Sequence, residues 1–355
     1  MLGHGGNVYE ASRELGIPVD HITDFSASIN PLGTPMSVVK ALQLRLGQLR
    51  HYPDISSAQL AEEISKSVGV GRDMIICGNG STELIYLVAR ALLPKRVLIT
   101  APSFSEYENA VNISCGLTRR RKLRVSHFSL HEKNDFRLDV DAFIEAMKGC
   151  DMAFICNPNN PTGCAVRRAD VLRIAREAEI NGCCLVVDEA FIDFIPKESV
   201  IKKVPEHPSL IVIRSMTKFY ALSGLRLGYA AVNPQLLEII NRHKEPWTVN
   251  SLAQAAGVAA LQDREYGNRT FKLLAKEKAF LENGFRRLGM RCIPSQANFY
   301  LIKTDAPYNI SLKLRKNGIL VRDCSNFIGL DSSYMRVAVR TRSENSKLLK
   351  ELASL

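Results

Sequence analysis

The sequence has few of the patterns that mark metal-binding, disulfide-linked or membrane proteins. Its nine cysteines form no C-x-x-C pair, and the adjacent Cys183 and Cys184 lie in an apolar run, which indicates buried, reduced thiols. The seven histidines are scattered along the chain, so no spacing predicts a zinc site and we expect no metal. No apolar stretch reaches the ~18 residues that a membrane-spanning helix needs.

The first seven residues, Met-Leu-Gly-His-Gly-Gly-Asn, have neither a charged segment nor an apolar segment of the kind that directs export. We therefore expect no signal peptide, no membrane partner and a cytoplasmic location.

The composition is that of an ordinary globular protein, but the formal net charge of +11 is strongly positive. The densest basic run, residues 119–124, contains no aromatic residue and accompanies no nucleic-acid-binding motif, so we expect a solvated face and no nucleic-acid partner. A positive field also suits an enzyme whose ligands are anionic phosphates.

The length of 355 residues suits one large domain and a smaller one. From about Asp73, short apolar runs alternate with helical stretches, which is typical of a doubly wound α/β domain. The runs are apolar on both faces and therefore predict strands covered by helices on each side. These predicted strands are residues 74–77, 96–100, 152–156, 183–187, 210–213 and 227–232.

Residues 251–288 have a helical pattern without proline and predict a connector into a C-terminal domain. That domain holds predicted strands at residues 297–302 and 334–339. We predict a large domain of residues 46–255 and a small α+β domain formed by residues 1–45 with 256–355.

Lys218 is the first candidate for chemistry. It follows a predicted strand in the motif Ser215-Met216-Thr217-Lys218, and Arg226 comes eight residues later. A lysine in this place is usually only the solvated end of a strand. However, burial or neighbouring cations lower the pKa of an amine, as covalent catalysis by lysine requires. Ser215 and Arg226 are candidates for binding a phosphate, the arginine with a bidentate fork.

Two further polar residues follow predicted strands. Asp188 is either a helix N-cap or the partner of a protonated ring nitrogen, a contact that lets an aromatic cofactor accept electrons. Asn160 lies in the turn of residues 157–163, beyond the carboxyl end of a strand, where α/β sheets bind ligands. We expect Asn160 to donate to an oxygen on the cofactor ring.

The turn Gly78-Asn79-Gly80-Ser81-Thr82-Glu83 joins a predicted strand to a predicted helix. Backbone N–H groups and the helix dipole make such a turn an anion site. It has neither the spacing of a P-loop nor a Rossmann fingerprint, so by itself it is weak support for phosphate binding.

The order of these motifs resembles that of the fold-type-I pyridoxal-phosphate enzymes, the aspartate aminotransferase superfamily, over nearly the whole chain. The motifs are Asn160-Pro161-Thr162-Gly163, Asp188-Glu189-Ala190, Ser215-Met216-Thr217-Lys218 and Arg226. The resemblance implies an α/β fold with a large domain built on a mostly parallel, doubly wound sheet and a smaller α+β domain. It also implies pyridoxal 5'-phosphate as the cofactor.

The resemblance assigns a role to each matching residue. Lys218 would carry the cofactor covalently and move protons, Asp188 would pair with the ring nitrogen, and Asn160 with the ring hydroxyl. Phe104 would stack on the ring. Tyr52 would reach the phosphate bound by a neighbouring subunit, which implies a homodimer. The residues that would hold the cofactor phosphate are Gly80, Ser81, Thr82, Ser215 and Arg226.

Within this superfamily the chain is similar to the histidinol-phosphate aminotransferases and closer to the threonine-phosphate decarboxylases. The segments that carry this likeness begin at His4, Asp24, Asp188 and Gly329. They imply decarboxylation of L-threonine O-3-phosphate to (R)-1-amino-2-propanol phosphate for cobalamin biosynthesis. The alternatives are decarboxylation of L-serine O-phosphate to ethanolamine phosphate and transamination of histidinol phosphate. A binding protein without catalysis is disfavoured because Lys218 is intact.

Two positions depart from the family pattern. Phe191 stands where many of the transaminases have a tyrosine that donates to the ring oxygen. Ser28 stands where we expect asparagine, which leaves serine phosphate open as the substrate.

Arg336 matches the position that anchors the substrate carboxylate. The other substrate-binding candidates are Arg322 and His4, for the phosphate, with Ser28, Asn30 and Asn160.

Overall fold

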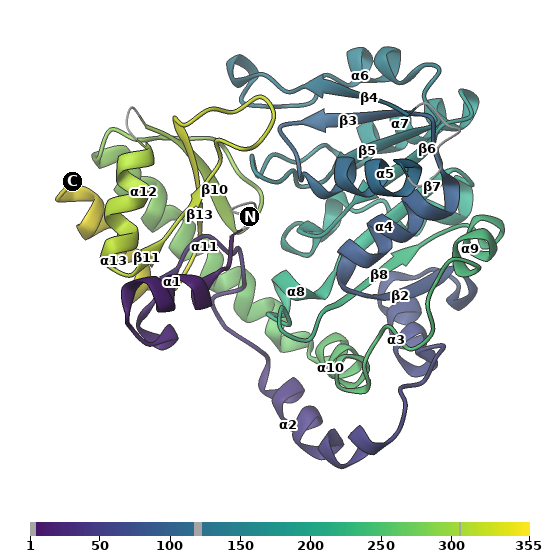
Figure 1. Ribbon diagram of the computed structural model, residues 1–355, viewed down its shortest axis with the longest axis horizontal. Coiled ribbons are helices and arrows are strands. Elements are labelled where there is room, and N and C mark those ends of the chain that lie inside the picture. The colour runs from purple at the N-terminus through teal and green to yellow at the C-terminus, as the bar shows by residue number, and fades with distance from the viewer. Residues whose placement is uncertain (1–4, 117–122, 305–306) are drawn as a thin grey trace.

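The computed structural model describes residues 5–116, 123–304 and 307–355. The chain forms two lobes (Figure 1). The large lobe is built on a seven-stranded sheet, and the small lobe on a four-stranded and a two-stranded sheet. His4 and residues 119–122 of the basic run, for which the sequence makes predictions, lie outside the described residues.

The large sheet has the strand order β2-β8-β7-β6-β5-β3-β4. Within this sheet β8 pairs antiparallel with both β2 and β7, and the other pairs of described strands are parallel, which confirms the predicted mostly parallel sheet. The strands are β2 (Ile75–Asn79), β3 (Arg96–Ala101), β4 (Arg124–Ser129), β5 (Met152–Cys156), β6 (Cys184–Asp188), β7 (Leu210–Ser215) and β8 (Leu227–Ala231).

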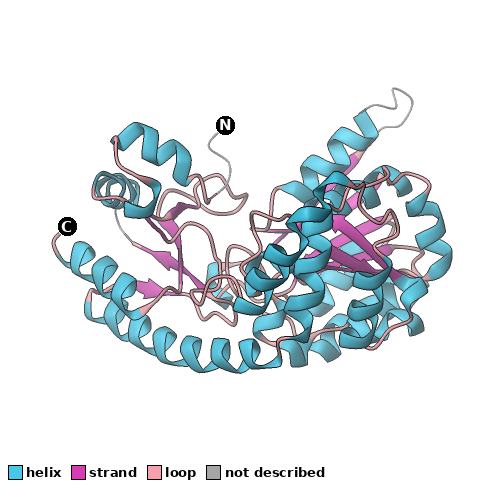
Figure 2. Cartoon of the chain, turned by 90° about the horizontal axis from the view of Figure 1, so that it is seen from below, coloured by secondary structure: helices cyan, strands magenta, loops and turns pink. Residues whose placement is uncertain are grey.

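Helices cover both faces of this sheet (Figure 2), as the strands with two apolar faces predict. Apolar clusters lie on the two sides: one includes Ile64, Val187 and Ala253, and the other includes Leu84, Tyr107 and Phe154. The helices that supply these clusters include α3 (Ala58–Val68), α4 (Gly80–Leu92), α5 (Glu106–Gly116), α6 (Val140–Met147), α7 (Arg168–Ile180), α9 (Pro234–Asn241) and α10 (Ser251–Gln262).

The small lobe contains the antiparallel sheet β12-β13-β10-β9 and the parallel pair β1-β11. Its strands are β1 (Thr23–Asp24), β9 (Arg291–Cys292), β10 (Phe299–Lys303), β11 (Ile319–Leu320), β12 (Arg322–Asp323) and β13 (Tyr334–Ala338). Its helices are α1 (Val8–Leu15), α11 (Arg264–Arg287), α12 (Pro307–Lys316) and α13 (Arg342–Ala353). The pairing of β1 with β11 joins the start of the chain to its C-terminal third.

Three details differ from the sequence-based expectation. The predicted continuous helix over residues 251–288 is interrupted at Asp263, whose side chain accepts from the Tyr266 N–H and so begins α11. Strand β4 was not predicted, because four of its six residues are exposed and it lacks an apolar run. Helix α2 (Met36–Arg45) packs against α10 of the large lobe, although the predicted division placed it in the small domain. The domain boundaries stay a prediction.

No helix in the described residues combines the length and the apolar character that crossing a membrane requires.

Candidate active site

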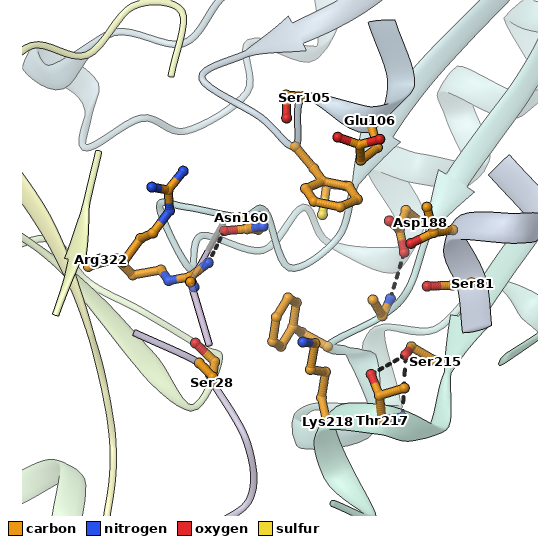
Figure 3. Close-up of a pocket in the computed structure, with 18 of the residues that line it drawn as sticks. Ser28, Ser81, Ser105, Glu106, Asn160, Asp188, Ser215, Thr217, Lys218 and Arg322 are labelled. Atoms are coloured by element: carbon orange, nitrogen blue, oxygen red, sulfur yellow. Dashed lines mark hydrogen bonds between the residues drawn. The ribbon is translucent and has the colours of Figure 1, made fainter. Parts of the chain in front are cut away.

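A cavity of about 370 Å³ is lined by residues of both lobes. The structure brings most of the predicted site residues to its wall. From the large lobe these are Ser81, Thr82, Phe104, Asn160, Asp188, Ser215, Lys218 and Arg226. Ser28 comes from the segment after β1, and Arg322 and Arg336 come from the small sheet. In Figure 3, Lys218 points into the middle of the cavity, with Asp188 and Ser81 on one side and Arg322 and Ser28 on the other.

Lys218 is in the short helix α8 (Met216–Phe219), directly after β7. Its backbone carbonyl accepts from the Asn30 N–H at 3.0 Å, which ties the helix to the N-terminal segment. Burial, helped by the charges of Arg336 and Arg226, lowers the pKa of the Lys218 amine to about 8. A substantial fraction of this amine is therefore neutral near physiological pH, as an amine that forms a covalent bond to a carbonyl must be.

Asp188 ends strand β6 and is only 4% exposed. Its two oxygens have separate donors: the Tyr107 hydroxyl donates to Oδ2 at 2.6 Å, and the Ala190 N–H donates to Oδ1 at 2.9 Å. Burial raises the pKa of the Asp188 carboxyl, whereas both hydrogen bonds favour its ionised form. A buried carboxylate held in this way suits a cationic ring nitrogen in the cavity.

The turn between β2 and α4 forms a close-packed cradle. A Cβ atom on Gly80, where φ is +80°, would lie 2.6 Å from Nη2 of Arg226, and one on Gly228 would lie 2.4 Å from the Ser81 backbone nitrogen. Glycine at both positions thus lets strand β8 and the arginine approach the first turn of α4. Backbone N–H groups, hydroxyls and a guanidinium converge there, which is the donor set of a phosphate site.

The hydroxyls in this cradle come from the residues just before Lys218. Ser215 ends β7 and caps α8, and its Oγ lies 2.7 Å from the Thr217 hydroxyl oxygen. Thr217 also lines the cavity. Sequence reasoning did not assign it a role, although it stands inside the lysine motif between two predicted site residues.

The opposite end of the cavity carries two buried arginines. Arg322 in β12 and Arg336 in β13 are directly paired across the small sheet. Arg336 donates to the Ser26 carbonyl at 2.7 Å and to Oδ1 of Asn160, and its guanidinium lies 5.1 Å from the centre of the Phe299 ring. Burial lowers the pKa of Arg336 to about 10 and also lowers the pKa of Arg322. The guanidinium groups of Arg322 and Arg336 carry like charges and are both buried. This arrangement favours the binding of an anionic ligand between them and the cofactor end.

Ser28 also lines the cavity and is 1% exposed. Among the described residues, neither its Oγ nor Nε of Arg336 has a hydrogen-bond partner. Unpaired buried polar atoms are costly, so their presence on one wall of a cavity indicates where a ligand or water binds.

Three predicted residues lie elsewhere. Asn30 is buried outside the cavity wall, where its Nδ2 donates to the Phe219 carbonyl and the Thr270 hydroxyl, both at 2.8 Å. Gly80 shapes the cradle without lining the cavity. Tyr52 lies away from this cavity and is 81% exposed, and its ring packs at a tilt against that of Trp247 with the ring centres 5.0 Å apart.

This arrangement agrees with the comparison with known proteins. Residues 20–352 match the family model described as aminotransferase class I and II. The chain belongs to this family. Over 357 residues it is 39% identical to a threonine-phosphate decarboxylase of Salmonella typhimurium, and the match covers 99% of this chain and 96% of that protein.

Two solved structures are similar over most of the chain. The histidinol-phosphate aminotransferase from Clostridium acetobutylicum is 30% identical with a TM-score of 0.87, and the match covers 94% of this chain and 98% of that one. The L-threonine-O-3-phosphate decarboxylase from Porphyromonas gingivalis is 27% identical with a TM-score of 0.82, covering 94% and 99%. The fold is thus fold type I, as the sequence motifs imply.

Pyridoxal 5'-phosphate is the cofactor of aminotransferase class I and II enzymes, and the residues present fit it. The cradle at α4 suits its phosphate, the Asp188 carboxylate suits its ring nitrogen, and the partly neutral Lys218 amine suits its aldehyde. Phe191 is buried against Phe299, with ring centres 5.0 Å apart, and offers the ring oxygen no donor.

Sequence reasoning missed several residues of this class I and II site. Tyr107, the donor to Asp188, lies in α5 outside any recognised motif and resembles an ordinary core aromatic in the sequence. Asn326 and Phe327 line the cavity from the loop after β12, where no motif marks them. Glu106 and Cys156 also line it. Only Cys156 had a usable signal, because it ends a predicted strand beside Asp188.

Proposed function

We propose that this chain is a pyridoxal-phosphate-dependent decarboxylase that converts L-threonine O-3-phosphate to (R)-1-amino-2-propanol phosphate. The observation that carries the proposal is the pair of buried arginines, Arg322 and Arg336, on the cavity wall opposite the cofactor end. A phosphorylated amino acid carries two anionic groups, a carboxylate and a phosphate, and two cations at one end of the cavity complement them. The full-length similarity to a threonine-phosphate decarboxylase supports the same substrate class.

The cofactor, when bound, accepts the electron pair that is released at the substrate Cα. Lys218 would hold the cofactor covalently, and its Nζ would return a proton to Cα. Asp188 would keep the ring nitrogen protonated. Phe104 would pack on the ring, and Asn160 would donate to the ring hydroxyl. The first turn of α4, Ser215 and Arg226 would hold the phosphate.

The choice between decarboxylation and transamination depends on how the substrate is anchored. The bond that breaks is the one held perpendicular to the cofactor ring, so anchoring selects it. We propose that Arg336 would hold the carboxylate and Arg322 the phosphate, and that these two anchors together would present the bond from Cα to the carboxylate for cleavage. A transaminase would instead turn the Cα–H bond towards Lys218.

Ser28 bears on the choice between threonine phosphate and serine phosphate. These substrates differ by one methyl group, which a pocket distinguishes by only ~1–3 kcal/mol. Ser28 lines the cavity at a position where the decarboxylase pattern leads us to expect asparagine, so it leaves serine phosphate open. The full-length similarity to a threonine-phosphate decarboxylase favours threonine phosphate, and serine phosphate is kept as the alternative.

The homodimer is part of the proposal. The region around Tyr52 presents exposed apolar side chains, namely Leu44, Leu46, Leu49, Ile55 and Trp247. A second copy of the chain would cover them and would bring Tyr52 to the cofactor phosphate of its partner. The cytoplasmic location expected from the sequence also remains a proposal.

The test is a product assay on protein reconstituted with pyridoxal phosphate. L-threonine phosphate, L-serine phosphate and histidinol phosphate with a keto-acid acceptor are supplied separately, while carbon dioxide and the cofactor absorbance are followed. We expect carbon dioxide from threonine phosphate, at least tenfold faster than from serine phosphate, with the cofactor unchanged. The Lys218→Met protein is the control for carbon dioxide that is not produced by the enzyme.

Conversion of the cofactor to its pyridoxamine form without carbon dioxide would contradict the proposal and assign transamination. Faster turnover of serine phosphate would keep the reaction and correct the substrate.

A further inference from the structure

Tyr107 connects two residues of the cofactor end and has no role in the function proposed above. It lies in the first turns of α5 and is fully buried. Its ring stacks on Phe154 of β5 at 5.1 Å and meets the ring of Phe104 edge-on at 5.7 Å. Its hydroxyl donates to Oδ2 of Asp188 at 2.6 Å.

This hydrogen bond fixes the orientation of the carboxylate. Tyr107 holds Oδ2 from α5, and the Ala190 N–H holds Oδ1 from the chain that follows β6. With one donor on each oxygen, the carboxyl group cannot rotate without losing a bond. A carboxylate has about four acceptor positions, so acceptor capacity remains for a donor in the cavity.

The same bond opposes the effect of burial on the charge of Asp188. Burial raises the pKa of Asp188, and the hydrogen bond from Tyr107 lowers it. Burial also raises the pKa of the Tyr107 phenol well above its usual range, so the phenol remains a donor at physiological pH. A bond of this kind to an ionised group is stronger than one between neutral groups.

The other titratable groups around Asp188 come from β5, from the residue that follows β6 and from α8. Cys156 of β5 stays a neutral thiol because burial raises its pKa. Glu189, the next residue after Asp188, is buried and paired with Arg214 at 2.9 Å. Lys218 in α8 favours the charged form of Asp188 until the lysine is neutral or covalently bound. The Tyr107 hydroxyl then remains as a neutral donor whose contribution does not change with the state of the lysine.

We infer that Tyr107 is a positioning residue, whose hydroxyl keeps the Asp188 carboxylate ionised and aimed at the ring nitrogen of the cofactor. Through its contact with Phe104 the same side chain also supports the residue that packs on the ring face. The inference rests on the cofactor site and not on the identity of the substrate. It therefore stands or falls separately from the proposed decarboxylation.

The test is the Tyr107→Phe variant, which keeps the ring and removes the hydroxyl. We expect kcat to fall about 10- to 100-fold, the loss expected for one hydrogen bond to a charged group. We expect cofactor affinity to fall as well, as measured by titrating cofactor-free protein with pyridoxal phosphate. Without the hydroxyl the pKa of Asp188 rises further, so the low-pH limb of the kcat profile and of the cofactor absorbance moves to higher pH, by about one unit.

Tyr300→Phe is the matched control. Tyr300 is also buried and its hydroxyl also donates to a carboxylate, that of Glu282, but it does not line the cavity. This variant loses a comparable bond, so it reports the general cost to stability. We expect it to leave cofactor affinity unchanged, together with the low-pH limbs of the kcat profile and of the cofactor absorbance.

A double-mutant cycle with Asp188→Asn separates a role through Asp188 from a general packing effect. In the Asp188→Asn background, removing the Tyr107 hydroxyl should lower cofactor affinity less than twofold. The inference is overturned if Tyr107→Phe retains the cofactor affinity and pH profile of the wild type. It is equally overturned if the effects of the two substitutions on affinity simply multiply.

Discussion

The two ends of the cavity differ in how completely the protein satisfies its own polar groups. At the cofactor end, both oxygens of Asp188 have donors and the hydroxyls of Ser215 and Thr217 lie 2.7 Å apart. At the substrate end, Oγ of Ser28 and Nε of Arg336 have no partner among the described residues. The first end is organised before any ligand arrives, and the second needs a ligand or water to complete it.

The difference follows from where the residues come from. The cofactor end is built on the carboxyl ends of parallel strands and on one helix terminus, all within the large lobe. The substrate end is assembled from β12, β13 and the segment after β1, which are far apart in the sequence. The polar groups of the cofactor site are paired within the protein, whereas some of those at the substrate site are not. This difference is consistent with a family in which the same cofactor site supports different reactions.

The largest expected effect is a loss of turnover on substitution of Lys218, which lies between the cofactor end and the substrate end of the cavity. Lys218→Met removes the amine and should lower turnover at least about a thousandfold, because covalent attachment of the cofactor and proton transfer are both lost. The assay is turnover together with the absorbance of the bound cofactor. Turnover close to that of the wild type would remove Lys218 from the chemistry.

The comparison is sharpened by paired substitutions at the two ends. Arg336→Ala should raise the KM for the phosphorylated amino acid about 10- to 100-fold and leave cofactor affinity within about twofold. Ser215→Ala should weaken cofactor affinity about three- to tenfold and change KM less. Both constants are measured for both variants. If each substitution weakens cofactor and substrate equally, the two ends are not separate sites.

The smallest expected effect is on the free energy of unfolding, which is lowered by the burial of the charged Lys218 amine. The pKa of Lys218 in the folded protein, about 8, lies below the ordinary 10.5. Cofactor-free protein therefore loses stability as the pH falls from about 10.5 to 8, and the full cost is present below pH 8. Lys218→Met should raise the free energy of unfolding by roughly 1–2 kcal/mol at pH 7, allowing for partial exposure of the side chain.

Urea unfolding at pH 7 and at pH 10.5 checks this expectation, since the gain should shrink at the higher pH. Lys278 provides the comparison, because its amine has a pKa also lowered to about 8 but donates to the Ser295 and Ala297 carbonyls at 2.7 and 2.9 Å. Lys278→Met should lower stability. A loss of stability in Lys218→Met as well would contradict a cost of burial at the active site.

Much of the cofactor end was predictable because its residues sit in local motifs. Lys218 and Ser215 share one strand-to-helix turn, Asp188 ends a strand, and Ser81 begins a helix, so their positions follow from the order of strands in a parallel sheet. The substrate end was less predictable. Arg336 was identified only by resemblance, and the sequence does not show that Arg322 lies directly opposite it.

Asn30 illustrates a limit of motif reasoning. It lies in a segment that resembles the decarboxylases, but its amide binds the Phe219 carbonyl and the Thr270 hydroxyl and so holds chain segments together. A buried asparagine that anchors a loop and one that contacts a ligand look the same in a sequence, since both need the same side chain.

The sequence by itself predicted the α/β fold class from apolar strand patterns and the cofactor from the family resemblance of its short motifs, because both are local properties of the chain. Only the tertiary structure decided that Tyr107 donates to Asp188, that two arginines face one cavity and that Tyr52 lies outside it. These facts depend on contacts between residues distant in sequence. Such contacts are set by how helices and sheets pack, which no local pattern encodes.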